Sequence, residues 1–158
     1  SKKKFFLKYE EKNFSKKKEI VISTGMTNQK YVNFVLKNFL SFKKLYLMHC
    51  VSSYPTSIEQ LNMSIVSKYV EYSKKFKNIV PGYSSHDTGN YGSILATALG
   101  AKIIEKHIKL GNNDWYHFDD TAIQCGSQLI NYVDTIKKTS CSIGDGKKKI
   151  IKFEHHKY

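Results

Sequence analysis

Two histidines lie near the ends of neighbouring predicted strands and are the residues best suited to chemistry in this chain. His86 lies in the segment GYSSHDTG, and His107 lies in the segment AKIIEKHIKL. Because side chains alternate between the two faces of a strand, Ser84 shares a face with His86, and Glu105 shares a face with His107. Two imidazoles and a carboxylate can therefore converge, as in a metal site. The alternative is that each histidine is a hydrogen-bonded structural group at a strand end.

Four pairs of strand and helix follow one another along the chain and would position these residues. β-branched or apolar runs predict strands at 19–25, 44–50, 78–86 and 101–110. Apolar residues at helical spacing predict helices at 28–40, from about Ile58, at 93–100 with Gly100 as the terminating glycine, and at 127–140. Successive units of this kind require a parallel sheet with helical crossovers. The sequence therefore predicts an α/β fold.

The pattern fits either an open sheet or a (β/α)8 TIM barrel. No GxGxxG, GxxxxGKS or GxxxxGKT loop follows a predicted strand, so the usual nucleotide-binding open sheets lack their fingerprint and the barrel is favoured. Eight strands need roughly 250 residues, so we expect this chain to form half a barrel. Residues 1–145 are predicted as a partial barrel domain, in which 1–18 form a lysine-rich amphipathic helix. Residues 146–158 are predicted as a basic tail or linker.

The charge and the cysteines exclude some classes of function. The formal net charge is +13, but every basic residue is lysine, which weakens a nucleic-acid interpretation and favours attraction of an anionic substrate. Three cysteines without a CxxC pair indicate neither a disulfide framework nor a zinc finger, so we expect buried thiols in a reducing cytoplasm. No apolar run approaches the ~18 residues that span a bilayer, so no membrane span is expected.

Four of these segments resemble, in order and at similar spacing, segments of the sialic acid synthase family. They are ISTGM (22–26), HCVSSYPT (49–56), GYSSHDTG (82–89) and ALGAKIIEKHIKL (98–110). The resemblance implies that this chain supplies strands five to eight of a (β/α)8 barrel. In complete members of the family, a small antifreeze-like domain follows the barrel and caps a neighbouring subunit. The resemblance therefore implies a homodimer for the full-length protein, and it implies that the tail leads toward an absent antifreeze-like domain.

The family condenses phosphoenolpyruvate with an N-acylated amino sugar, typically N-acetylmannosamine or a relative, and releases phosphate. The resemblance implies that His86 and His107 bind a divalent metal that polarises the sugar aldehyde. Imidazole ligands favour Mn²⁺, with Mg²⁺ as the alternative. Glu105 matches a family carboxylate that could orient a metal-bound water or hydrogen-bond the sugar.

Further residues match substrate-binding positions of the family. Ser23 and Ser84 match positions that hold phosphate, although a serine at a strand end also satisfies backbone groups. Ser52 stands where many members carry asparagine, which weakens the amide contact expected there. Tyr54 matches a tyrosine that faces the sugar, with a core aromatic as the alternative. His49 has the opposite parity to Ser52 and is expected to face the helix layer.

The loop after the fourth predicted strand departs most from the family. Many relatives have a glycine-proline-aspartate stretch that binds sugar hydroxyls, whereas this chain has GNNDWYHFDD. Asp119 is the best match for the sugar-binding aspartate, with Asp114 and Asp120 as competitors. Trp115 and His117 lie in the same loop. Because this loop contacts the sugar, the sequence does not indicate which nine-carbon sugar acid is made.

Three functions remain open on the sequence. The first is part of a phosphoenolpyruvate-dependent sugar acid synthase whose activity requires the absent half, because the family's earlier strands carry a glutamate and lysines with no counterpart here. The second is another phosphoenolpyruvate-using or sugar-phosphate barrel lyase. The third is a non-catalytic or degenerate half-barrel module. Half a barrel leaves two sheet edges unpaired, so we expect a truncated gene product, or a barrel completed by another copy of the chain or by a separate polypeptide. The chain also begins without methionine, which indicates processing or a piece of something longer.

Overall fold

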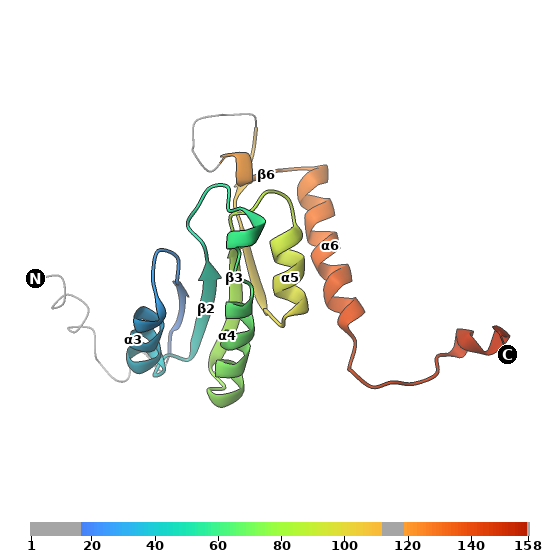
Figure 1. Cartoon of the computed structure of the whole chain (residues 1–158), viewed down its shortest axis with the longest axis horizontal. Coiled ribbons are helices and arrows are strands. Elements are labelled where there is room, and N and C mark those ends of the chain that lie inside the picture. The colour runs from blue at the N-terminus through green and yellow to red at the C-terminus, as the bar shows by residue number, and fades with distance from the viewer. Residues whose placement is uncertain (1–16, 112–118, 158) are drawn as a thin grey trace, which may run out of the picture.

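The computed structural model describes residues 17–111 and 119–157, and its centre is a parallel sheet of four strands. The strands are β1 (Glu19–Ser23), β2 (Lys44–Cys50), β3 (Ile79–Ser85) and β4 (Ile103–Lys106). They lie in the sheet in chain order, and each neighbouring pair is parallel (Figure 1). The predicted α/β fold with a parallel sheet is therefore confirmed, and the sheet has the form of a half-barrel.

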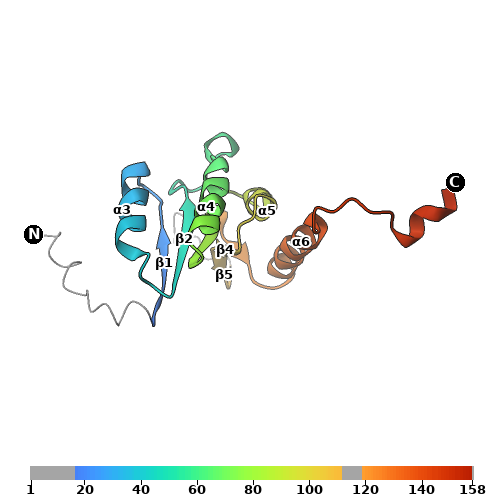
Figure 2. The same cartoon turned by 90° about the horizontal axis from the view of Figure 1, so that it is seen from below.

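The three crossover helices cover one face of this sheet. They are α3 (Gln29–Phe39), α4 (Ser64–Lys75) and α5 (Tyr91–Ala98), and Figure 2 shows them in one layer above the strands. The last helix, α6 (Ser127–Ile143), packs beside α5, where the hydroxyl groups of Ser93 and Tyr132 are 2.5 Å apart. We call the face toward the helices the helix face and the opposite face the inner face.

Short elements lie at the carboxyl ends of the strands and in the tail. β5 (Ile108–Lys109) pairs in parallel with β6 (Ile123–Gln124). Three 3₁₀ turns complete the described elements: η2 (Ile58–Gln60), η3 (Asp119–Thr121) and η4 (Lys152–Lys157). No helix within the described ranges is long and apolar enough to cross a membrane.

The hydrophobic core lies between the helix face and the helices. Leu45 and Leu47 of β2 are fully buried against Val35 of α3 and Tyr69 of α4. Strand alternation sends the intervening side chains to the inner face, where Val21 of β1 is 55% exposed. The helix face of the sheet is therefore packed, and the inner face is more exposed. Each charged or polar candidate can be assigned to one of these two faces.

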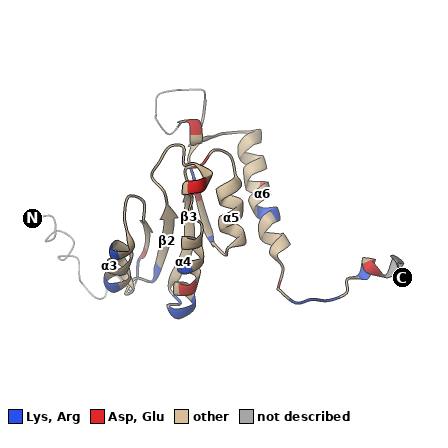
Figure 3. Ribbon diagram, viewed as in Figure 1, with Lys and Arg blue, Asp and Glu red and all other residues tan. Residues whose placement is uncertain are grey.

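Exposed lysines gather around the amino-terminal end of the sheet rather than at the carboxyl ends of its strands. Five of them lie at the start of β2 and around the end of α4 (Figure 3): Lys43, Lys44, Lys74, Lys75 and Lys77. This group of positive charges lies away from the strand ends that carry the candidate histidines.

Several predicted boundaries differ from the structure. The helix expected from about Ile58 is instead a 3₁₀ turn, and α4 begins at Ser64, because Asn62 adopts a positive φ of 46° that interrupts helical hydrogen bonding. The strand predicted over 101–110 is divided into β4 and β5 at His107. The prediction for Gly100 is confirmed, since its φ is +103° and its N–H donates to the Thr97 carbonyl.

Pro81 lies inside β3 although that strand has neighbours on both sides. Its carbonyl accepts from the Lys102 N–H at 2.8 Å, and the paired register with β4 starts one residue later, at Gly82 and Ile103. Within a strand, the N–H and C=O of one residue point to the same side, so the missing N–H of Pro81 would face a stretch where β4 has not begun. The proline therefore removes no bond from the paired register.

Leu47→Ala tests the assignment of the helix face as the packed face. We expect this change to lower the free energy of unfolding by about 2–5 kcal/mol, because it leaves a cavity at a fully buried position. Leu110→Ala is the matched control, since that leucine is 92% exposed and its truncation should change stability by less than about 0.5 kcal/mol. Equal effects of the two changes in urea unfolding would contradict the assignment.

Candidate functional site

The register of β3 and β4 brings the four polar candidates together on the inner face. Ser84 lies opposite Glu105 in the sheet, and its Oγ donates to Glu105 Oε1 at 2.6 Å. Just beyond these residues, the rings of His86 and His107 lie with centroids 5.3 Å apart and planes inclined by 61°. The convergence expected from side-chain alternation is therefore present, while the chemical roles of the four residues remain predictions.

Two hydrogen bonds fix the orientation of the His86 ring. Nδ1 lies 2.7 Å from the Val51 carbonyl oxygen, and because a carbonyl only accepts, Nδ1 carries a proton and donates. In the neutral ring Nε2 is then the acceptor, and the Tyr54 hydroxyl donates to it at 3.0 Å. His86 as a whole residue is 4% exposed. This arrangement leaves Nε2 as the nitrogen that can bind an incoming group.

The loop after β2 is folded over the two histidines. The Tyr54 ring lies 4.1 Å from the His86 ring and 5.8 Å from the His107 ring, measured between centroids. The Thr56 N–H donates to the His86 carbonyl at 2.9 Å, and the Thr56 hydroxyl bonds to the carbonyls of Val51 and Ser53. Tyr54 is therefore half-buried and contacts both candidate histidines, and its contact with the sugar stays a prediction.

Cys50 is a member of the site that the sequence did not reveal. Its Sγ lies 3.6 Å from His86 Nδ1 and 3.8 Å from Ser52 Oγ. The sequence gives only the expectation of a buried thiol, because the residue that Cys50 contacts is 36 positions away along the chain. Only Cys50 fulfils the expectation of burial, since Cys125 is half-buried and Cys141 is exposed. The available sequence signal was parity, because Cys50 lies two residues before Ser52 and so shares its face of the strand.

The thiol and the imidazole change one another's proton affinity. Burial raises the pKa of the Cys50 thiol, but its hydrogen bonds to His86, Ser23 and Ser52 outweigh burial, and the pKa is lowered overall. Burial likewise lowers the pKa of His86, but the interactions with Cys50 and the Val51 carbonyl raise it more. Each group therefore favours the charged form of the other, with the Nδ1–H of His86 facing both the sulfur and the Val51 carbonyl.

Two of the three serines predicted to touch substrate lie at the neighbouring ends of β1 and β2. Ser23 ends β1 and Ser52 follows β2, and both are exposed. Gly25, in the turn after β1, approaches Ser52 and Cys50 so closely that an added Cβ would lie 2.3 Å from Ser52 Oγ and 3.0 Å from Cys50 Sγ. A glycine in this turn therefore allows the ends of β1 and β2 to come together beside Cys50.

The candidates in the long loop are only partly described. Asp114, Trp115 and His117 lie outside the described residues. Asp119 begins η3, and its side chain is not among those described, whereas Asp120 is exposed. The choice among the three aspartates therefore stays a prediction.

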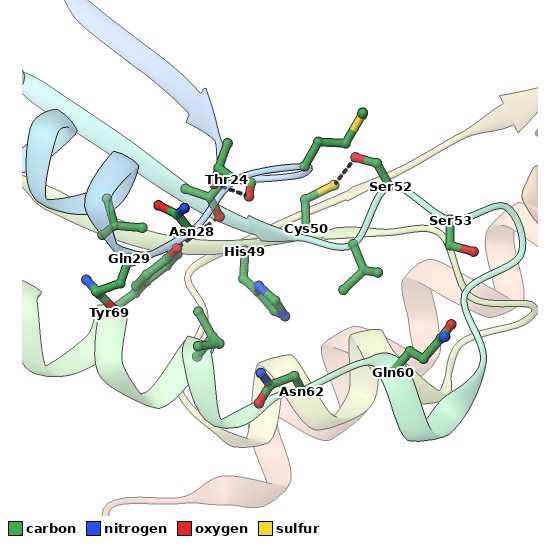
Figure 4. A pocket seen from close by; sticks show the side chains of 15 residues that line it. Thr24, Asn28, Gln29, His49, Cys50, Ser52, Ser53, Gln60, Asn62 and Tyr69 are labelled. Atoms are coloured by element: carbon green, nitrogen blue, oxygen red, sulfur yellow. Dashed lines mark hydrogen bonds between the residues drawn. The ribbon is translucent and has the colours of Figure 1, made fainter.

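A separate polar cavity lies beside the site, at the carboxyl ends of β1 and β2. Its volume is about 470 Å³, and Figure 4 shows hydroxyl and amide side chains around it. Cys50 and Ser52 line it, whereas His86 and His107 do not. His49 also lines it from the helix face, as its parity predicted, with Nε2 2.8 Å from the Leu61 carbonyl oxygen. Burial lowers the pKa of His49, which favours a neutral ring there.

The donor chemistry at the inner face fits a divalent metal with two protein ligands. The Val51 carbonyl holds Nδ1–H of His86, which is how protein carbonyls commonly orient a ligating imidazole. His107 lies close enough for its ring to share an ion with His86, provided that the Tyr54 hydroxyl leaves Nε2. The described residues contain no group of three or more histidine, cysteine, aspartate or glutamate side chains arranged around a metal. Other ligands would therefore come from water, substrate or residues outside the described ranges.

Comparison with known proteins gives one family and several relatives. The model of the NeuB family matches residues 2–148. Human N-acetylneuraminate-9-phosphate synthase is 32% identical over 147 residues, covering 92% of this chain and 40% of that protein. N,N'-diacetyllegionaminic acid synthase of Campylobacter jejuni is 33% identical over 141 residues, covering 87% and 41%. The chain thus spans about 40% of the length of the curated relatives it matches.

Solved structures show the same fold. N-acetylneuraminic acid synthetase from Leptospira borgpetersenii, solved in complex with citrate, superposes with a TM-score of 0.70 at 26% identity and covers 85% of this chain and 46% of that chain. A spore coat polysaccharide biosynthesis protein of Bacillus subtilis superposes with a TM-score of 0.69 at 24% identity, covering 90% and 39%. The second likeness supports the fold alone.

Cys50→Ala tests the coupling between the thiol and His86. The change removes an interaction that raises the pKa of His86 and leaves the burial that lowers it, so we expect the pKa of His86 to fall. NMR titration of ring-labelled histidine measures this. Cys141→Ala, at an exposed position, is the control and should leave the pKa of His86 unchanged. An unchanged pKa of His86 in Cys50→Ala would contradict the coupling.

Proposed function

The chain belongs to the NeuB family, and we propose that it forms the metal-binding side of a synthase that condenses phosphoenolpyruvate with an N-acylated amino sugar. The curated relatives are named as synthases of neuraminate phosphate, legionaminic acid and pseudaminic acid, which supports a sugar acid synthase. The observation that carries the proposal is the pairing of His86 and His107 beside the Ser84–Glu105 hydrogen bond.

We propose that the complete protein is a (β/α)8 barrel and that this chain supplies strands five to eight. The half-barrel sheet, with helices on one face, supports this, as does the coverage of 40–46% of the matched relatives. In such a barrel the inner face becomes the barrel interior, and the carboxyl ends of the strands carry the active site. The remaining phosphate and sugar ligands would then come from the other strands.

His86 and His107 are the proposed metal ligands, and Mn²⁺ is favoured over Mg²⁺ because imidazole is a borderline donor. When bound, the metal polarises the aldehyde of the open-chain sugar so that it accepts the carbon nucleophile. The protein's part is to present neutral imidazole. The Val51 carbonyl fixes the tautomer of His86. The Tyr54 hydroxyl is hydrogen-bonded to Nε2 of His86 and would have to leave this nitrogen before a metal could bind there.

Glu105 is proposed to take a proton from water or to hold a sugar hydroxyl, and Ser84 orients it. The Ser84 hydroxyl has one proton, and in this structure that proton is donated to Glu105. Ser84 can therefore donate to the phosphate of phosphoenolpyruvate only by turning away from Glu105. If Ser84 has both roles, binding of phosphate releases one oxygen of Glu105 for proton transfer.

The sugar is proposed to lie against Tyr54 and Ser52, with Asp119 holding a hydroxyl from the loop beyond β5. Ser23, exposed at the end of β1, is the second proposed phosphate donor. Ser52 lines the polar cavity, where a hydroxyl replaces the amide that many relatives carry. The serine hydroxyl makes a weaker contact there than the expected amide would.

The reaction is tested by phosphate release from phosphoenolpyruvate, using the full-length protein that contains this chain. We expect release with N-acetylmannosamine or a related N-acylated sugar, and a loss of about 10²- to 10⁴-fold in kcat for Glu105→Gln if Glu105 transfers a proton. Glu71→Gln is the control, because Glu71 is exposed on α4. Preference for an unacylated sugar phosphate would contradict the proposed substrate.

Metal binding is tested by manganese titration of the histidine variants. We expect His86→Ala and His107→Ala each to weaken binding at least about tenfold, and His155→Ala in the tail to leave it unchanged. Protons compete with the metal for His86, whose pKa is raised, so affinity should fall as the pH is lowered through that pKa. Unchanged binding in both histidine variants would remove the metal from the proposal.

A further inference from the structure

Lys106, Ser85 and Asp87 are joined by hydrogen bonds on the helix face, opposite the side of the sheet that carries the two histidines. We call these three residues the clamp. Lys106 precedes His107 and Asp87 follows His86, so each is the chain neighbour of a candidate ligand. The Lys106 ammonium donates to Ser85 Oγ at 3.0 Å and to the backbone carbonyl of Asp87. A side chain of β4 therefore holds the backbone one residue beyond His86.

The Asp87 end of the clamp is anchored by three further hydrogen bonds. One carboxylate oxygen accepts from the Ser85 hydroxyl at 2.6 Å and from the Tyr83 hydroxyl at 3.1 Å. The other accepts from the Gly92 N–H at 2.9 Å, in the first turn of α5. Asp87 is 3% exposed and Ser85 is fully buried. Lys106 thus grips a segment that is already fixed to β3 and α5.

Gly92 allows this close packing. A Cβ at that position would lie 2.7 Å from the Tyr83 hydroxyl and 2.8 Å from Asp87 Oδ1. The helix therefore approaches the carboxylate at a distance that only a glycine permits without displacement. The segment around Asp87 is therefore closely packed against α5.

The clamp is sensitive to loss of the lysine. Without the ammonium, the Asp87 carbonyl loses a donor in a buried place where water does not easily replace it. The segment after His86 could then relax away from β4.

We infer that Lys106 is a positioning residue that sets the distance and angle between the His86 and His107 rings. Residues 106 and 107 share one peptide unit, and residues 86 and 87 share another. The Asp87 carbonyl belongs to the following peptide, between Asp87 and Thr88. The bond from Lys106 therefore ties the residue that precedes His107 to the chain one residue beyond His86, on the helix face. The consequence for metal binding rests on the proposed function, whereas the geometric claim does not.

The test is the nuclear Overhauser effect between the two imidazole rings, measured on the full chain with labelled histidine and no added metal. The wild-type rings, at 5.3 Å between centroids, should give cross-peaks. We expect Lys106→Met to abolish these cross-peaks while the amide spectrum remains that of a folded protein. Lys102→Met, at an exposed lysine preceding β4, is the control and should retain the cross-peaks.

A second variant guards against a failure of Lys106→Met to fold. Lys106→Gln keeps a polar side chain that is too short to bond both Ser85 and the Asp87 carbonyl, so we expect weakened cross-peaks in a folded protein. Unchanged cross-peaks in whichever of the two variants folds, or the same loss in Lys102→Met, would overturn the inference.

This readout separates the clamp from the proposed reaction. If the cross-peaks disappear in Lys106→Met but the full-length wild-type protein releases no phosphate from phosphoenolpyruvate, positioning by Lys106 stands and the proposed function fails. If the cross-peaks are unchanged while kcat falls, Lys106 acts in another way and the proposed function stands.

Discussion

The parallel register of β3 and β4 is the constraint on which the site depends. It places Ser84 opposite Glu105 and carries His86 and His107 to the same edge of the inner face. The same alternation sends Lys106 to the helix face, where it reaches the Asp87 carbonyl. A shift of one residue would exchange the two faces and separate every one of these contacts. The pairing of β3 with β4 therefore places the candidate site residues on the inner face and the clamp on the helix face.

Local pattern was sufficient to predict the sheet and much of the site. The bounds of β2, the glycine that ends α5 and the convergence of His86 with His107 follow from alternation and from residue type. The loop over His86 did not follow, because Tyr54 and Cys50 meet that ring across 32 and 36 residues of sequence. Such contacts depend on how the carboxyl ends of neighbouring strands close together.

The clamp was also missed, although the sequence carried a signal for it. A lysine at position 106 has the parity of the helix face, where a buried ammonium requires fixed acceptors. A search for those acceptors would have pointed to the serine and aspartate on either side of His86. The break of the fourth predicted strand at His107 has no comparable local cue. The position of η2 before α4 depends on the positive φ of Asn62, which polar composition alone does not specify.

The central claim is that His86 and His107 hold a metal on the inner face for the condensation chemistry of the NeuB family. The most direct measurement is anomalous diffraction at the manganese edge, from crystals of the full-length protein grown with Mn²⁺. The account predicts an anomalous peak between Nε2 of His86 and the His107 ring, with the Tyr54 hydroxyl moved away from Nε2. Manganese bound elsewhere, with the Tyr54–His86 hydrogen bond intact, would contradict the account.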